Sequence, residues 1–215
     1  MRKILFYLIF LISFGLYAQE TEQSQEVENV DLLEEKVKRF SAGVKVGVPN
    51  IVGLSFEGVT PLLDNRLAAF ADFSGFNVTN EETEIDLSYS EFGANFYFGN
   101  KGKGFYAGLG AGKLSTNLTF TQQTDGGTAT GSTGLDIKAT NFKLGVKTGG
   151  TIYFRFEVGF GISEVPETID IRLSDGTTET LRIHGVGGTD DQSLNIPGVS
   201  GNGILVGNFG FGLSF

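Results

Sequence analysis

Cysteine is absent from this chain of 215 residues. Its absence excludes disulfides, zinc–thiolate sites, cysteine nucleophiles and lipid attachment at a cysteine. Basic residues are also scarce, because 16 Lys and Arg stand against 25 Asp and Glu. A chain with this balance lacks the basic footprint that nucleic-acid binding requires, so no nucleic-acid partner is expected.

A hydrophobic run long enough for a membrane-spanning helix is missing too. The apolar residues 4–16 follow a positively charged start, and they fall short of the about 20 residues that such a helix needs. Leu16-Tyr17-Ala18 then offers a cleavage site with a small last residue. We therefore predict a secretory signal peptide over residues 1–18. Its removal leaves 14 basic and 25 acidic residues, a net charge of about −11.

Residues 19–39 are polar and acidic. Val30, Leu33 and Val37 give them only a thin helical stripe. We expect a periplasmic arm, either a short helix or a disordered tail, that takes no part in a core.

Glycine and phenylalanine are abundant, with 32 and 20 copies. From Phe40 onward, apolar residues recur with the period of two that is typical of β-strands. The pattern is clearest over residues 151–162, whereas the phase of residues 67–76 stays open. It predicts eight strands, at residues 40–48, 51–59, 67–76, 85–98, 105–120, 135–147, 151–162 and 203–215.

The apolar side changes within two of these strands. The change falls near Ser90 in the strand over residues 85–98 and near Lys113 in the strand over residues 105–120. One extra residue in a strand shifts every later side chain to the other face, so we predict a β-bulge at each position.

The seven connections between the strands sort by length. If both termini lie in the periplasm, three of the four outward connections are long, at residues 77–84, 121–134 and 163–200, and all three periplasmic connections are short. Short turns at one end and long loops at the other are typical of transmembrane barrels.

Polar residues lie opposite the apolar stripes. The interior of an eight-stranded barrel is just wide enough for its own side chains, and stripes of phenylalanine would overfill it. We therefore expect apolar side chains outside, against lipid, and polar side chains inside. The inward charges predict a lumen network of Lys45, Glu57, Lys143, Arg155 and Glu157.

The partners within this network follow from an assumed turn length. With three residues in the first turn, Lys45 lies opposite Ser55 and diagonal to Glu57; in the same way Lys143 lies opposite Arg155 and diagonal to Glu157. Buried charges need partners. The network would be either a salt-bridged plug or the gate of a narrow ion path.

The last strand ends in a comb of alternating apolar residues: Phe209, Phe211, Leu213 and Phe215. With the signal peptide, the eight strands and the sorted loops, residues 40–215 resemble the small outer-membrane β-barrels of the OmpA, OmpX and OmpW type. The resemblance implies an all-β, up-and-down, eight-stranded antiparallel transmembrane β-barrel in the outer membrane with both termini periplasmic. It also implies that the comb contacts lipid and is read by the barrel-assembly machinery.

Sequence motifs for chemistry are weak. Residues 108–115 imitate a phosphate-binding loop, but Leu114 stands where that loop needs Ser or Thr. The single histidine, His184, has no serine or carboxylate at a spacing that favours catalysis. We expect no enzyme activity, cofactor or metal. The predicted function is an envelope scaffold or a surface-exposed protein that binds an extracellular ligand through residues 163–200; the alternatives are a small channel for ions or small apolar solutes and a lipid-modifying enzyme.

Overall fold

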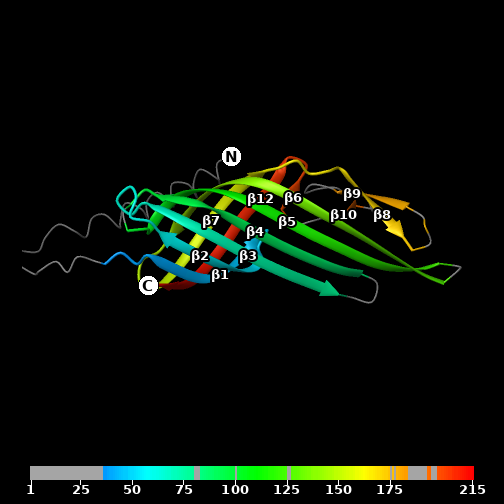
Figure 1. The fold of residues 1–215 in the computed structure, drawn as a ribbon, viewed down its shortest axis with the longest axis horizontal. Helices are drawn as coiled ribbons and strands as arrows, with labels where there is room; N and C mark the ends of the chain where they lie inside the picture. Colours follow the sequence, from blue (N-terminus) through cyan, green and yellow to red (C-terminus); the bar gives the residue numbers. More distant parts are fainter. Residues whose placement is uncertain are drawn as a thin grey trace, which may run out of the picture. The chain divides into compact units, whose positions relative to one another are not determined.

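A computed structural model describes residues 36–79, 83–99, 101–124, 127–174, 176, 178–183, 193–194 and 198–215. The regular elements of this part of the chain are all β-strands (Figure 1). None of the described residues forms a helix that is long and apolar enough to cross a membrane. The predicted signal peptide, most of the predicted arm and His184 lie outside the described residues.

Eight strands close into an antiparallel barrel. Each strand pairs with the next one along the chain, and the last strand pairs with both the seventh and the first. The predicted closed antiparallel barrel is therefore confirmed. Its strands are β1 (Phe40–Val48), β2 (Ile51–Val59), β3 (Leu67–Thr79), β4 (Thr83–Tyr97), β5 (Gly104–Thr124), β6 (Gly127–Lys147), β7 (Ile152–Ile162) and β12 (Gly203–Ser214).

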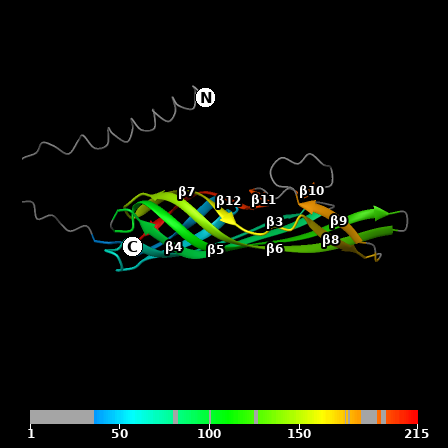
Figure 2. The ribbon, with the colours of Figure 1, turned by 90° about the horizontal axis from the view of Figure 1, so that it is seen from above.

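The central strands are longer than predicted. β5 and β6 have 21 residues each, whereas β1 and β2 have nine. β2 pairs with β3 only as far as Ser74, and β7 pairs with β6 only as far as Thr140, so the sheet of β3 to β6 continues beyond the closed barrel (Figures 1 and 2). The prediction of long loops at residues 77–84 and 121–134 was wrong. Neither face of these segments is apolar, and the sequence pattern of a strand is then lost although the backbone pairing continues.

Four short strands lie in the segment that was predicted as one polar loop. They are β8 (Thr168–Leu173), β9 (Thr178–Ile183), β10 (Ser193–Leu194) and β11 (Val199–Ser200). β8 pairs with β6 at Gly131 and Ser132, and β9 pairs with β8, so this hairpin widens the sheet beyond the barrel. Residues 163–200 thus add to the protruding sheet, which consists of the outer ends of β3 to β6 together with β8 and β9.

The first and last residues of the barrel meet at the end of the barrel that lies away from the protruding sheet. Phe40 and Phe215 exchange backbone hydrogen bonds of 3.0 and 2.9 Å. The connections over residues 60–66, 98–103 and 148–151 lie at this same end because the strands run up and down. These three connections and both barrel termini therefore share one end, whereas the two-residue connection between β1 and β2 lies at the other.

The two predicted bulges are absent. The register of β4 is unbroken against β3 and β5, and β5 pairs with β6 without a slip over the whole strand. Tyr89 and Glu91 both point inward and are buried, on either side of the point where the sequence changes phase. The apolar residues change sides while the backbone does not, because the surroundings of the strand change along its length.

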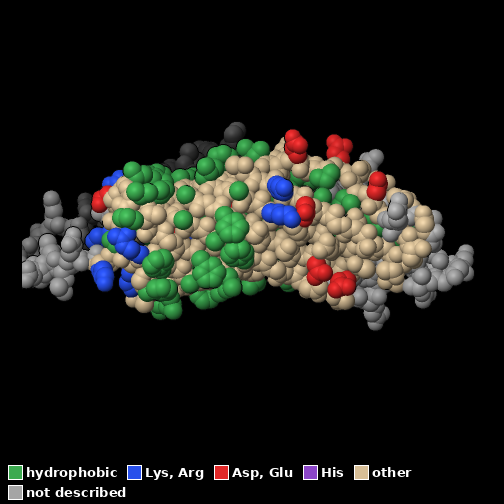
Figure 3. Space-filling model, viewed as in Figure 1, with side chains coloured by type: hydrophobic (Ala, Val, Ile, Leu, Met, Phe, Trp, Pro, Cys, Tyr) green, Lys and Arg blue, Asp and Glu red, His purple; other side chains and the backbone are tan. Residues whose placement is uncertain are grey.

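The outer surface of the barrel carries a belt of exposed hydrophobic side chains (Figure 3). β7 shows the arrangement clearly, since its exposed and buried residues alternate over nearly its whole length. The belt also includes outward side chains of the other barrel strands, among them Leu54, Phe56, Phe73, Phe92, Leu109, Phe142, Leu144 and Leu205.

Glycine residues on the inward face of the strands leave room for the larger side chains of the lumen. A Cβ atom on Gly145 would lie 2.4 Å from the ring of Tyr106, which projects into the lumen. Glycine at this strand position allows the close approach of the ring, as expected where a barrel interior is crowded.

Candidate functional site: the charged lumen

Eight charged side chains lie inside the barrel among the described residues, and none is more than 4% exposed. The five residues predicted from the sequence are all among them. The other three are Asp72, Glu91 and Lys147. Four of the eight are acidic and four are basic, so their formal charges balance: Glu57, Asp72, Glu91 and Glu157 against Lys45, Lys143, Lys147 and Arg155.

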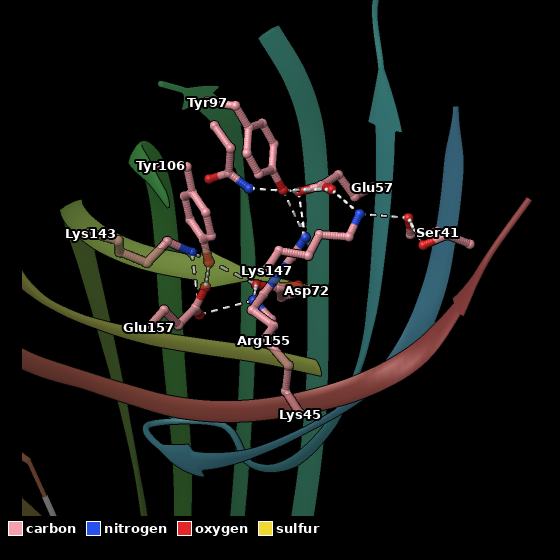
Figure 4. A network of polar contacts seen from close by, with 12 residues as sticks. Ser41, Lys45, Glu57, Asp72, Tyr97, Tyr106, Lys143, Lys147, Arg155 and Glu157 are labelled. Carbon is pink, nitrogen blue, oxygen red and sulfur yellow. Dashed lines mark hydrogen bonds and ion pairs between the residues drawn. The ribbon is translucent and has the colours of Figure 1, made fainter. Parts of the chain in front are cut away.

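The Glu57 carboxylate is the centre of one half of the network (Figure 4). Arg155 Nη2 lies 2.5 Å from Glu57 Oε2, and Lys147 Nζ lies 2.7 Å from Glu57 Oε1. The Tyr97 hydroxyl and the Asn95 amide also donate to this carboxylate, at 2.9 and 2.8 Å. Both carboxylate oxygens are thus engaged by cationic and neutral donors from three other strands.

The Glu157 carboxylate is the centre of the other half. Lys45 Nζ lies 2.9 Å from Glu157 Oε1 and 2.6 Å from Asp72 Oδ2, so one ammonium joins two carboxylates. The Tyr106 hydroxyl and the Asn208 amide donate to Glu157 at 2.8 and 3.0 Å. Because β1, β3, β5, β7 and β12 all contribute, the network spans the width of the barrel.

Lys143 links this half to Glu91. Its ammonium lies 3.0 Å from Glu91 Oε1, 3.8 Å from Asp72 Oδ2 and 4.0 Å from the centre of the Phe70 ring. The Tyr89 hydroxyl donates to the second oxygen of Glu91 at 3.0 Å. Glu157 Oε1 lies 3.7 Å away as well, so an aromatic ring and three carboxylates surround this buried cation.

Of the two predicted cross-strand diagonals, Lys45–Glu57 was wrong and Lys143–Glu157 is confirmed. Lys45 lies opposite Gly53, and Glu57 lies opposite Ser41, because the first turn closes at the pair Gly47–Ile51, one position earlier in the chain than assumed, which shifts the register by two residues. Lys143 lies opposite Gly159 and not Arg155, since the connection between β6 and β7 is longer than assumed, but it still lies diagonal to Glu157, with Nζ 3.7 Å from Oε1. The other ion pairs of the lumen join strands that are not neighbours in the barrel.

Three charged residues escaped prediction for separate reasons. Asp72 lies in the strand whose phase stayed open, and Glu91 lies beside the predicted bulge at Ser90. Lys147 is the last residue of β6, next to a turn. A constant phase through β4 would have placed Glu91 inside, on the same face as Asn95 and Tyr97.

An apolar layer adjoins the charges on each side. Toward the chain ends, Val59, Ala68, Tyr97 and Tyr106 form a buried cluster, and Val37 of the predicted arm packs against it. Toward the protruding sheet, a second buried cluster consists of Tyr89, Leu114, Leu135, Ile137, Ala139, Val199 and Ile204. The charged layer therefore lies between two groups of hydrophobic and aromatic side chains.

Some buried polar atoms of the lumen have no hydrogen-bond partner in the protein. They include Asp72 Oδ1, Asn141 Oδ1 and two guanidinium nitrogens of Arg155. Buried polar groups normally bind either protein or water. These atoms mark the places in the lumen where water would bind.

The terminal comb lies on the outer surface of β12. Phe209, Phe211, Leu213 and Phe215 are 46, 51, 54 and 69% exposed. β12 pairs with β1 on one side and β7 on the other, so it is the strand that closes the barrel. The Phe209 ring packs 6.2 Å from that of Phe154 on β7, which extends the apolar belt across the closing seam.

The residues that imitate a phosphate-binding loop lie inside β5, where Gly108, Gly110 and Gly112 point into the lumen. They form a continuous strand between β4 and β6 and not a loop before a helix. The described residues contain no group of three or more His, Cys, Asp or Glu side chains that could hold a metal ion.

No protein-family model and no curated protein matches this chain. The chain is similar to several solved structures, two of which come from Acinetobacter baumannii. CarO2 of Acinetobacter baumannii is 16% identical, with 84% of this chain and 100% of that chain covered and a TM-score of 0.45. CarO of the same organism is 14% identical, with 81% and 97% covered and a TM-score of 0.43. The fold defines the chain as a closed eight-stranded antiparallel barrel, and its role is argued below from its own residues.

Proposed function

We propose that this chain is a non-enzymatic barrel of the outer membrane whose lumen is plugged by paired charges. It would act as an envelope scaffold or as a surface-exposed binding protein. The belt of exposed Phe, Leu, Ile and Val side chains supports the membrane assignment, because monomeric soluble proteins rarely expose such large apolar surfaces. A closed barrel also pairs the backbone groups of every strand, which lipid requires.

The orientation follows from the two ends of the barrel. We place the chain termini, and the three connections at the same end of the barrel, in the periplasm, consistent with the predicted signal peptide. The protruding sheet then stands outside the cell, where it would meet an extracellular ligand or partner. This proposal widens the predicted binding segment, residues 163–200, to the sheet that β8 and β9 extend. The terminal comb on β12 would be read by the barrel-assembly machinery during insertion.

One observation carries the plug: four acidic and four basic side chains, all buried, are paired between two apolar layers. Balanced charges leave no net field that would attract either anions or cations into the lumen. Each ion that crossed would have to separate pairs such as Arg155–Glu57 and then pass an apolar layer. Ion pairs with this many donors are costly to break when buried.

Planar-bilayer recording tests the plug. The purified mature protein is expected to insert without producing discrete conductance steps at neutral pH. The double variant Glu57→Gln, Glu157→Gln keeps the shape of both side chains but leaves an excess of positive charge in the lumen. This double variant is the matched comparison for the parent protein. It would conduct anions only if its lumen opens.

A narrow channel is the second candidate, and the unpartnered polar atoms favour it, because water bound there would connect parts of the lumen. Reproducible conductance steps of the parent protein, with an ion selectivity that changes in Glu157→Gln, would replace the plug with this channel. Heat-resistant migration of the folded barrel in gels serves as the control that the protein tested is folded.

A further inference from the structure

A groove of about 420 Å³ opens on the outside of the barrel, where β4, β5 and β6 leave the apolar belt. Neighbouring residues of one row across the strands shape it. Phe92, Ala111 and Thr140 lie side by side on β4, β5 and β6, and Ile162 of β7 lies opposite Thr140. Small Ala111 forms the floor, and the exposed side chains of Phe92 and Ile162 form the walls.

The end of the groove that lies farther from the protruding sheet is continuous with the apolar belt. Leu109 and Phe142 lie opposite each other on β5 and β6, one outward position below Ala111 and Thr140, and each is 52% exposed. The groove is therefore continuous with the surface that faces lipid under the proposed function. An acyl chain of a bilayer lipid has the shape and the polarity that this end accepts.

Two lysines lie at the other end of the groove, toward the protruding sheet. Lys113 of β5 and Lys138 of β6 are direct cross-strand partners on the outer face, and both line the groove. Like charges that lie directly opposite each other destabilise a sheet unless a counter-charge is present. Figure 3 shows basic side chains beside an acidic one at the border of the hydrophobic surface.

Asp136 supplies only part of that counter-charge. It lies 2.9 Å from Lys113 Nζ and accepts a hydrogen bond of 2.6 Å from the Ser115 hydroxyl. In the described part of the chain, Lys138 takes part in none of the ion pairs. Two cations and one carboxylate leave a positive charge at the end of an apolar groove.

We propose that this groove binds a phosphate-bearing anionic membrane lipid. One acyl chain would lie on Ala111 between Phe92 and Ile162, and the phosphate would bind Lys113 and Lys138. The inference rests on the proposed function, because it requires the belt to lie in a bilayer. Basic residues where a transmembrane surface meets its interface are suited to anionic headgroups. Lysines that only extended toward water would show no preference among lipids.

Native mass spectrometry of the purified mature protein in detergent tests the site, with phosphatidic acid and phosphatidylcholine of the same acyl chains as probes. The parent is expected to retain phosphatidic acid at concentrations where phosphatidylcholine is lost. The double variant Lys113→Gln, Lys138→Gln should weaken retention of phosphatidic acid by at least about tenfold, the factor that corresponds to about 1.4 kcal/mol.

Two pairs of variants separate a built site from general attraction. Ala111→Leu fills the floor while both lysines remain and should also weaken retention, whereas Ala107→Leu, an outward position lower on the same strand, should not. The double variant Lys101→Gln, Lys103→Gln removes the same charge near the other end of the barrel and should leave retention at the parent level.

Equal retention of the two lipids by the parent would overturn the proposal. So would parent-level retention by Lys113→Gln, Lys138→Gln, or an equal loss in both lysine double variants. Recovery of the parent in outer-membrane fractions, with heat-resistant migration, is measured on the same cells. If the parent is absent from those fractions, the membrane proposal fails; if it is present and lipid-indifferent, only the groove fails.

Discussion

The two halves of β4, β5 and β6 use the same alternation in opposite senses. In the belt, apolar side chains point outward, as with Leu109 at 52% exposure, and charges such as Glu91 point inward. Beyond Ser90 and Lys113 the apolar side chains point inward, as with Leu114 at 1% exposure, and the outer face carries Ser, Asn, Asp and Lys.

This reversal fits the proposed placement of the barrel in a bilayer. An apolar side chain turns away from water, so under that proposal outward apolar residues face lipid and inward ones form a protein core with water outside. The backbone register does not change where the pattern reverses. The border, at Lys113 and Lys138, is where we place the edge of the bilayer.

The largest expected contrast between the two halves is access from outside the cell. An epitope inserted between Thr124 and Gly127, at the tip of the protruding sheet, should bind antibody on intact cells. The same epitope at Gly149 should bind only after permeabilisation, because residues 148–151 lie at the end that we place in the periplasm. Labelling in the reverse pattern would show that the barrel is inverted.

Removal of a lumen charge is expected to have the largest effect on stability. Glu157→Ala leaves Lys45 and Lys143 poorly compensated inside the barrel, at a cost of about 3–5 kcal/mol if the site is dry. Glu84→Ala removes a carboxylate from the exposed face of the protruding sheet and should change the free energy of unfolding by less than about 0.5 kcal/mol. Urea unfolding of folded barrel in lipid vesicles measures both. Equal midpoints for the two variants would contradict a dry, tightly paired lumen.

Truncation of apolar side chains compares the inside of one half with the outside of the other. Leu114→Ala removes a side chain from the buried cluster and should cost about 2–5 kcal/mol, because a cavity remains. Leu109→Ala, on the same strand but exposed in the belt, leaves no protein cavity and should cost about 1 kcal/mol or less. The measurement is the difference in the free energy of unfolding between Leu114→Ala and Leu109→Ala. A larger loss in Leu109→Ala would mean that the outer face is the packed one.

Charge on the outer face gives the smallest of these contrasts. Phe211→Arg puts a cation into the belt, and such a change costs about 2–4 kcal/mol at the middle of a bilayer and less near its edges. Asn117→Arg puts the same side chain on the outer face of the protruding sheet, where water surrounds it, and should be nearly neutral. The yield of heat-resistant barrel in outer-membrane fractions measures the two. An unchanged yield for Phe211→Arg would remove the support for lipid contact at the terminal comb.

Much of the barrel could be predicted from local pattern. β7 and β12 alternate without interruption, and their outward Phe, Ile and Leu residues follow directly from that alternation. The tips of β5 and β6, over residues 121–124 and 127–134, could not be predicted, because Thr, Ser and Gly on both faces give no period to detect. Their pairing, from Thr124 opposite Gly127 downward, comes from the backbone hydrogen bonds of a hairpin whose side chains are nearly uniform in polarity.

By itself the sequence determined that the chain forms an all-β closed barrel, and it placed five charges on the inward face, since a period of two assigns each residue to one of two sides. The tertiary structure decided which charges meet, apart from the diagonal pair Lys143–Glu157. Lys45 joins Glu157 and Asp72, residues far apart in the chain, and Arg155 joins Glu57 across the lumen. The physical reason is that alternation records only the side of a strand, whereas a partner across the lumen depends on turn lengths and register. A change of two residues in a turn moves a side chain to another level of the barrel without altering its face.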